Sequence, residues 1–291
     1  MSRARRAALA AADEDTIDPY AAADHPPEAM HDRHLGVAPV GAPAVGACVS
    51  GTPYGAAMDP SLPKSLPPGG IVESYGRSGR LVWMSDGEVP DADTWWSRLY
   101  AERTRTGLYP VLLEYPEDMS AYKVGGDGPV DAAAYLSARW RPDAWPGFPR
   151  WPGLAAPAPA GADPDACAAE AATSVVDEGR ATCLALVRAE RGSDVPVALN
   201  WPGMTNRMTT ADLSGVLRSW EDRFAARLVG LGHGDLFLSA AIPPSDLHQA
   251  HVLAAEHYLT CPDVFHHSFD DWENTYPAEL LTLRQWHFWW D

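Results

Sequence analysis

The sequence predicts an α+β fold with a mixed or antiparallel sheet, helices packed mainly on one face, and a disordered N-terminal segment. Apolar runs of strand length are interspersed with helical patterns, which favours a sheet that is not purely parallel. Two such runs, 227–231 and 235–241, are joined by Gly-His-Gly, a signal for a β-hairpin. Residues 1–61 are rich in Ala, Pro, Gly and Asp without sustained periodicity, which predicts disorder.

The expected folded part begins at residue 62, just after Met58. We hypothesise that translation starts at Met58, and an intact mass that includes Met1 would overturn this. Residues 62–140 are expected to form an N-terminal α/β part. Its first helix is expected to start around Pro90, since the first helical turn tolerates proline. Gly107 is expected to end it. The other elements predicted here are a strand at 81–84, a strand at 109–113 and a short helix at 131–140.

The segment 141–164 is dense in Pro, Gly, Ala and Trp, and we interpret it as a linker or an irregular wrapping segment. Its tryptophans indicate that part of it packs on the core, because such large apolar side chains are rarely left in solvent. The tryptophans in question are Trp140, Trp145 and Trp151.

Residues 165–291 are expected to form a C-terminal α+β domain. Thr209, with Asp212 three residues later, predicts a capping box that opens a helix. Before it we predict a helix at 166–178, a buried strand at 182–188 and a neighbouring strand at 195–199. After the hairpin we predict a helix at 246–259, a helix at 270–281 that is broken or restarted at Pro277, and a final strand at 285–291.

Composition excludes several classes of partner. The 291 residues carry a formal net charge of −17, which repels phosphate backbones, and Lys64 and Lys123 form no basic face. We therefore expect no nucleic acid. No run approaches the ~20 apolar residues of a membrane span, so we expect no membrane contact. The cysteines have no CxxC spacing, which argues against a zinc ribbon or a disulfide framework and favours a cytoplasmic location. They are Cys48, Cys167, Cys183 and Cys261.

The C-terminal part contains short motifs in a specific order. They are Val216–Phe224, Ala226–Val229, Pro243–Pro244, Ala254–Tyr258, Cys261–Asp263 and Trp286–Asp291. Together they resemble a bacterial family called domain of unknown function 4253, known mainly from actinobacteria. Segments at 66–69, 106–110 and 150–154 are similar to that family too, so the resemblance covers roughly residues 62–291.

The resemblance implies one folded unit, and it brings no activity, cofactor or catalytic residue. The chain departs from the family pattern at two positions. Ala225 stands where a glycine is usual after the phenylalanine, and Val264 stands where an asparagine is usual after Cys-Pro-Asp. If that asparagine serves the family's function, this copy is altered.

A group of potential metal ligands falls within residues 248–267. It consists of His248, His251, Glu256, His257, Cys261, Asp263, His266 and His267. A His-xxx-Cys pair, as His257 and Cys261 stand, binds zinc if both side chains point inward. However, HExxH and paired-cysteine motifs are missing, and the competing interpretation places the first two histidines in solvent and His257 in the core or at a cap. We predict no cofactor and retain His257 and Cys261 as the metal-ligand candidates.

The run Trp-Glu-Asp-Arg-Phe at 220–224 offers two carboxylates for acid–base chemistry. Adjacent helical residues diverge by about 100°, so Glu221 and Asp222 do not easily share one target. The competing interpretation, which we favour, packs Trp220 and Phe224 inward and pairs Asp222 with Arg218 at the surface.

The final strand alternates between two sets of side chains. One face carries Trp286, Phe288 and Trp290, and the other carries His287, Trp289 and Asp291. One face must be core, and the other is either a partly exposed aromatic patch or the second face of a covered central strand.

The leading hypothesis is a non-enzymatic cytoplasmic module of accessory or immunity type, with a protein partner. It rests on the acidic charge, the aromatic ending, and the absence of GxSxG, Walker A, GxGxxG and CxxC motifs. The alternatives are a metal-dependent hydrolase that uses the His/Cys/Asp cluster and a small-ligand-binding domain with an aromatic-walled pocket. The binding candidates are Trp220, Glu221, Asp222, Arg223, His257, Cys261, Asp263 and Trp289.

Overall fold

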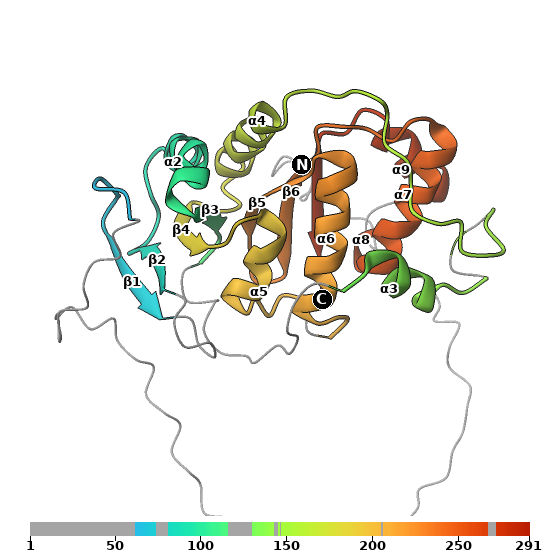
Figure 1. Cartoon of the computed structure of the whole chain (residues 1–291), viewed down its shortest axis with the longest axis horizontal. Coiled ribbons are helices and arrows are strands. Elements are labelled where there is room, and N and C mark those ends of the chain that lie inside the picture. The colour runs from blue at the N-terminus through green and yellow to red at the C-terminus, as the bar shows by residue number, and fades with distance from the viewer. Residues whose placement is uncertain are drawn as a thin grey trace, which may run out of the picture. The chain divides into compact units, whose positions relative to one another are not determined.

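One mixed sheet organises the described part of the chain (Figure 1). The computed structural model describes residues 62–73, 81–115, 130–142, 145, 147–204, 206–266 and 272–291. Its strands are β1 (Gly69–Glu73), β2 (Leu81–Ser85), β3 (Leu108–Leu113), β4 (Cys183–Arg188), β5 (Arg227–Leu231), β6 (Asp235–Ser239) and β7 (Gln285–Trp289). The predicted α+β class with a mixed sheet is confirmed. The expected disorder of 1–61 and the start at Met58 lie outside the described residues.

The strand order is β1-β2-β4-β3-β5-β6-β7. Only the β3–β5 pair is parallel among these neighbours, and the other pairs are antiparallel. Strand β4 lies between β2 and β3, which come from the part of the chain before residue 140. The two folded parts expected from the sequence therefore share one sheet.

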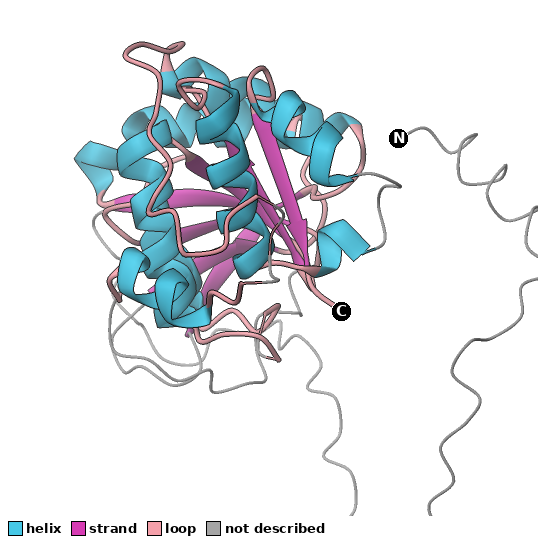
Figure 2. Cartoon of the chain, turned by 90° about the vertical axis from the view of Figure 1, so that its right-hand side faces the viewer, coloured by secondary structure: helices cyan, strands magenta, loops and turns pink. Residues whose placement is uncertain are grey.

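Helices cover the strands (Figure 2). They are α2 (Ala92–Thr106), α3 (Ala132–Arg139), α4 (Pro164–Asp177), α5 (Val195–Leu199), α6 (Thr210–Phe224), α7 (Leu247–Thr260), α8 (Asp263–His266) and α9 (Trp272–Leu280). Around β6 and β7, helices α6 and α7 lie against the face that carries Trp286, and α4 lies against the face that carries His287. None of the helices in the described ranges is both long and apolar enough to cross a membrane.

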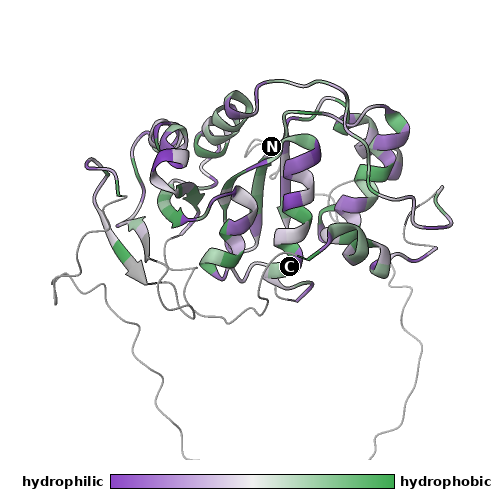
Figure 3. Ribbon diagram, in the orientation of Figure 1, coloured by the Kyte–Doolittle hydropathy of each residue, from purple (hydrophilic) through white to green (hydrophobic). Residues whose placement is uncertain are grey.

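Helix α6 shows how local sequence fixes an element. Thr209 and Asp212 form the predicted capping box, in which each side chain accepts the other residue's backbone N–H. The helix has a hydrophobic and a hydrophilic side (Figure 3), and its hydrophobic side includes the fully buried Trp220 and Phe224. The amphipathic pattern therefore directs α6 onto the sheet.

The helix ends at Ala225, whose backbone is left-handed with φ of 49°. A left-handed alanine is strained by about 1 kcal/mol or more, because its Cβ crowds the following carbonyl, whereas glycine adopts this conformation freely. This explains physically why glycine suits the position, where the family pattern was expected to have it.

Two sequence predictions about local structure are wrong. Residues 195–199 form helix α5 rather than a strand, because the preceding turn Gly192–Asp194 (η2) already winds the chain and Pro196 fits a first helical turn. Helix α9 continues through Pro277 without a break. The strand β1 was not predicted, since its two glycines give little strand signal.

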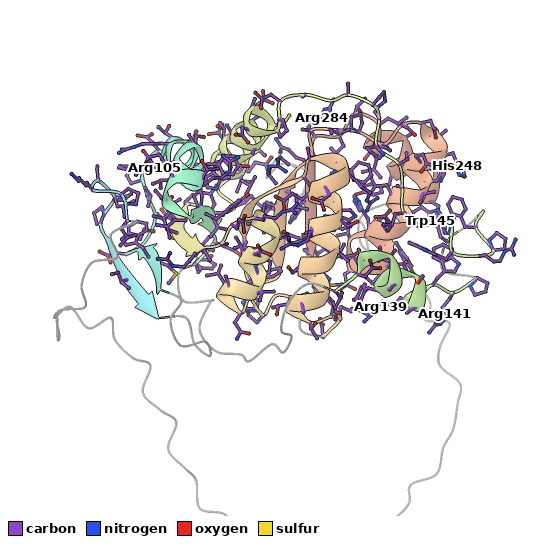
Figure 4. All side chains as sticks on the ribbon, viewed as in Figure 1. Arg105, Arg139, Arg141, Trp145, His248 and Arg284 are labelled. Carbon is purple, nitrogen blue, oxygen red and sulfur yellow. The ribbon has the colours of Figure 1, made fainter. Side chains whose placement is uncertain are left out.

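Residues 147–163 wrap over the fold as an irregular segment. Backbone hydrogen bonds join Ala158 N to Pro243 O at 2.8 Å and Ala162 N to Ala241 O at 3.0 Å. The nearby Trp145 is buried and makes edge contacts with the rings of Tyr258 and Phe265, next to α7 (Figure 4). This part of the chain therefore packs on the core.

Candidate functional site

Strand β7 separates two environments, because successive side chains point to opposite faces of the sheet. Trp286, Phe288 and Trp290 are buried, as predicted for one face. His287 and Trp289 on the other face are half-buried. Since β7 is the last strand of the sheet, its position at an edge is also established. We call the side that carries Trp286 the closed face and the side that carries His287 the open face.

The closed face is filled by aromatic rings around His257. The ring of Trp220 stacks on Phe288 at 5.3 Å between centroids, and His257 lies 4.7 Å from both Trp220 and Trp286. His257 Nδ1 is 2.8 Å from the hydroxyl of Tyr276, and its Nε2 has no hydrogen-bond partner among the described residues. Burial, with a smaller contribution from the charge of Arg223, holds the pKa of His257 well below its ordinary value. His257 is therefore a neutral core histidine at neutral pH.

A buried ion pair ties the closed face to the wrapping segment. Arg223 donates to both carboxylate oxygens of Glu256, at 2.9 and 2.7 Å, and to the carbonyl of Ala155 at 2.8 Å. Glu256, which is fully buried, also accepts from Trp220 Nε1 at 2.9 Å and from the backbone N–H of Ala155 at 2.7 Å. Because these partners satisfy the buried charges, Trp220, Arg223 and Glu256 form a structural network.

The two adjacent carboxylates near the end of α6, Glu221 and Asp222, both pair with Arg191. Arg191 Nε donates to Glu221 at 3.2 Å, and Arg191 Nη2 donates to Asp222. The expectation that these adjacent residues do not share a target is wrong, because a guanidinium presents donors on several edges and bridges both. The expected pair of Asp222 with Arg218 is also wrong, since Arg218 donates to Asp194 at 2.5 Å.

The cluster at 248–267 does not converge. Cys261 is fully buried and donates through Sγ to the carbonyl of Trp289 at 2.9 Å, and burial raises the pKa of its thiol to about 12. Asp263 accepts from Arg207 at 2.7 Å. Within the described ranges, no three His, Cys, Asp or Glu side chains are grouped to hold a metal ion.

The histidines of that cluster have separate surroundings. His248 is exposed, and its ring meets Phe148 edge-on at 5.6 Å (Figure 4), while His251 is half-buried. The side chain of His266 and all of His267 lie outside the described residues. The hydrolase alternative therefore loses the convergence on which it depended.

The open face carries a cavity of about 210 Å³ between α4 and the β6–β7 pair. It is lined by Ala171, Ser174, Val175, Glu178, Arg180, Phe237, Leu238, Leu283, Gln285, Trp286 and His287. Gln285 Nε2 donates to Ser174 Oγ at 2.9 Å and so bridges β7 to α4. The cavity joins an apolar interior to polar groups at its wall, the combination typical of small-molecule sites.

Arg180 and His287 line this cavity, and both contact Asp235. His287 Nε2 donates to Asp235 Oδ1 at 2.5 Å, and Arg180 Nη2 contacts the same oxygen at 3.4 Å. Arg180 Nη2 is also 3.0 Å from His287 Nε2. The His287 ring stacks on Phe237 with 4.7 Å between centroids and 9° between planes, which fixes its orientation.

Electrostatics keeps Asp235 ionised. Burial alone raises the pKa of its carboxyl, but the hydrogen bond and charge of His287 and the charge of Arg180 outweigh burial, so the pKa lies below its ordinary value. The ionised carboxylate of Asp235 accepts a hydrogen bond from His287 Nε2.

No sequence pattern pointed to Arg180, Asp235 or Phe237, and the alternation along the final strand gave His287 a face but no role. A usable signal was a polar residue within an otherwise apolar strand, at His287 and at Asp235. The pairing of Phe237 with His287 across β6 and β7 is a matter of register, which joins positions 50 residues apart. Arg180 follows α4 in a turn and reaches this site only through tertiary packing.

Residues 183–291 match the model of a family described as Domain of unknown function (DUF4253). The match supports the resemblance for the part of the chain from β4 to the last residue. It includes both faces of β7, with Asp235 and His287, and begins three residues after Arg180. No curated protein and no solved structure matches the chain.

Proposed function

We propose that this protein is a binding module and that the cavity on the open face holds a small ligand. This follows the small-ligand alternative of the sequence analysis. The observation that carries it is a cavity of about 210 Å³ with apolar lining residues and with Arg180 and His287 on its wall, both of which contact Asp235. A cavity of ~150 Å³ lined by apolar residues already accommodates benzene, so a ligand with one ring fits.

Contacts around the cavity support this function over a purely structural role. On the closed face the fully buried carboxylate of Glu256 is occupied by donors from Ala155, Trp220 and Arg223. On the open face Arg180 and His287 are each about one-third exposed, at 33% and 35% of their side chains. Polar groups held in place yet accessible beside an apolar cavity can meet a ligand.

The test is a thermal-shift screen of small molecules on the full chain and on two variants. Ser174→Phe fills the cavity from α4, whereas Asp177→Phe adds the same ring to an exposed position of α4 outside the cavity. A ligand at 100 times its Kd stabilises the folded state by about 2.7 kcal/mol. We expect compounds that raise the Tm of the wild type and of Asp177→Phe but not of Ser174→Phe. A screen without such compounds contradicts the proposal.

Binding of a protein partner is the second candidate function. The net charge of −17 supports it, because an acidic chain is electrostatically complementary to a partner with a basic surface. Purification of the tagged chain from its native host tests it. A basic protein that co-purifies stoichiometrically and dissociates as salt is raised would support this function. A preparation without a stoichiometric partner at low salt would count against it.

A further inference from the structure

We propose that the ligand of the open-face cavity is a small monocarboxylate with an apolar body, and that Arg180 holds its carboxylate. This inference rests on the binding function proposed above and specifies its ligand class. It depends on the donors that Arg180 retains, on the charge at the cavity and on the cavity's size.

Arg180 retains donors that no side chain uses. Its contacts with Asp235 and with His287 both employ Nη2, so within the described part of the chain Nε and Nη1 have no hydrogen-bond partner. Its guanidinium carbon lies 5.4 Å from the centroid of Phe237, which holds the group against the cavity floor. Nε and Nη1 lie on different sides of the guanidinium, and each offers an N–H donor to a carboxylate oxygen.

The carboxylates around Arg180 disfavour a ligand with more than one negative charge. Asp235 balances part of the charge of Arg180, and Glu178 stands exposed at the rim. Glu114 lies beyond Asp235, and its Oε2 accepts from the backbone N–H of His233 at 3.3 Å. A doubly charged phosphate would meet these three carboxylates, whereas a monocarboxylate needs only one guanidinium and is less strongly repelled.

The apolar body is accommodated by the rest of the cavity. Ala171, Val175, Phe237 and Leu283 offer carbon surface opposite the polar wall. A volume of about 210 Å³ holds one six-membered ring with a short acid group, by comparison with the ~150 Å³ cavity that binds benzene. The ligand is therefore expected to have about ten non-hydrogen atoms.

The experiment compares phenylacetate with phenylacetamide by titration calorimetry on the full chain. The two probes share size and shape and differ in charge. We expect phenylacetate to bind more tightly, and Arg180→Gln to weaken phenylacetate about tenfold or more while changing phenylacetamide little. Arg180→Lys, which keeps the charge and loses the planar fork, should recover part of the affinity.

Two further variants separate ligand contact from fold maintenance. Glu178→Gln removes the exposed carboxylate at the rim and should tighten phenylacetate severalfold without affecting phenylacetamide. Asp177→Gln is the matched control, because Asp177 is the exposed residue just before Glu178 and does not line the cavity. It should change the affinity for phenylacetate less than Glu178→Gln does.

The outcomes distinguish the two proposals. Equal or weaker binding of phenylacetate than of phenylacetamide, with both blocked by Ser174→Phe, overturns the ligand class and leaves the binding function standing. If neither probe nor any screened compound distinguishes wild type from Ser174→Phe, both proposals fail. Charge-dependent binding that survives Arg180→Gln also overturns the assignment, because the carboxylate must then be held elsewhere.

Discussion

The two faces of β7 each contain a histidine beside aromatic rings, yet the two histidines have opposite surroundings. His257 is fully buried on the closed face and meets one polar partner, Tyr276. His287 on the open face is about one-third exposed and meets Asp235, Arg180 and a cavity. The difference teaches that aromatic residues next to a histidine do not identify a site. What identifies one is a polar group that is held in place while still accessible.

The largest expected effect breaks the closed face. Glu256→Gln removes the negative charge that Arg223 needs in a buried setting, so we expect a loss of about 3–5 kcal/mol in the free energy of unfolding. Urea denaturation measures it. Asp222→Asn, in the exposed pair with Arg191, is the control on the same helix and should change stability by only about 0–1 kcal/mol. Equal losses in the two variants would show that the buried Arg223–Glu256 pair matters no more to stability than the exposed Arg191–Asp222 pair.

The second effect concerns pH and the closed-face histidine. Burial lowers the pKa of His257 in the folded chain, so below pH ~6.5 the unfolded chain binds a proton at this residue and the folded chain does not. The free energy of unfolding therefore falls as pH decreases. The contribution approaches about 1.4 kcal/mol per pH unit between the unfolded pKa of about 6.5 and the lower folded pKa. His257→Gln should remove this slope, as measured by urea denaturation at pH 7, 6 and 5. His248→Gln, at an exposed histidine, is the control and should retain the slope. If His257→Gln also retains it, the slope does not come from His257.

The third effect sharpens the comparison at the end of α6, the helix that supports the closed face. Ala225→Gly replaces a left-handed alanine by the residue that adopts this conformation without strain. We expect a gain of about 1 kcal/mol in stability, visible as a higher denaturation midpoint. Ala226→Gly at the next position, which lacks the left-handed backbone, should destabilise instead. A loss on Ala225→Gly would mean that the backbone there is not strained.

The smallest effect belongs to the open face. Because the pKa of Asp235 is lowered, its stabilising contribution is present above the unfolded value of about 4 and disappears as pH falls through the folded value. Asp235→Asn should therefore reduce stability by no more than about 1 kcal/mol at pH 6 and match the wild type near pH 2. Acid denaturation of both proteins measures this. A loss of several kcal/mol at pH 6 would make the open face as structural as the closed one.

The sequence by itself determined the elements whose signals are local. The capping box at Thr209, the Gly107 helix end, the hairpin and the alternation along β7 all depend on neighbouring residues, and each is present in the structure. The interpretation of Trp220 and Phe224 as core residues is likewise confirmed, because their spacing of four places both on one side of α6.

Only the tertiary structure decided the rest, because it depends on contacts between distant parts of the chain. Residues 195–199 have the apolar composition of a strand, yet they continue the turn Gly192–Asp194 as a helix. The insertion of β4 between β2 and β3, the bridging of Glu221 and Asp222 by Arg191, and the meeting of Arg180 with His287 join residues that no periodicity relates. Local patterns specify which face of an element is buried, whereas the partner it is buried against, and the cavity left between partners, follow from how the whole chain packs.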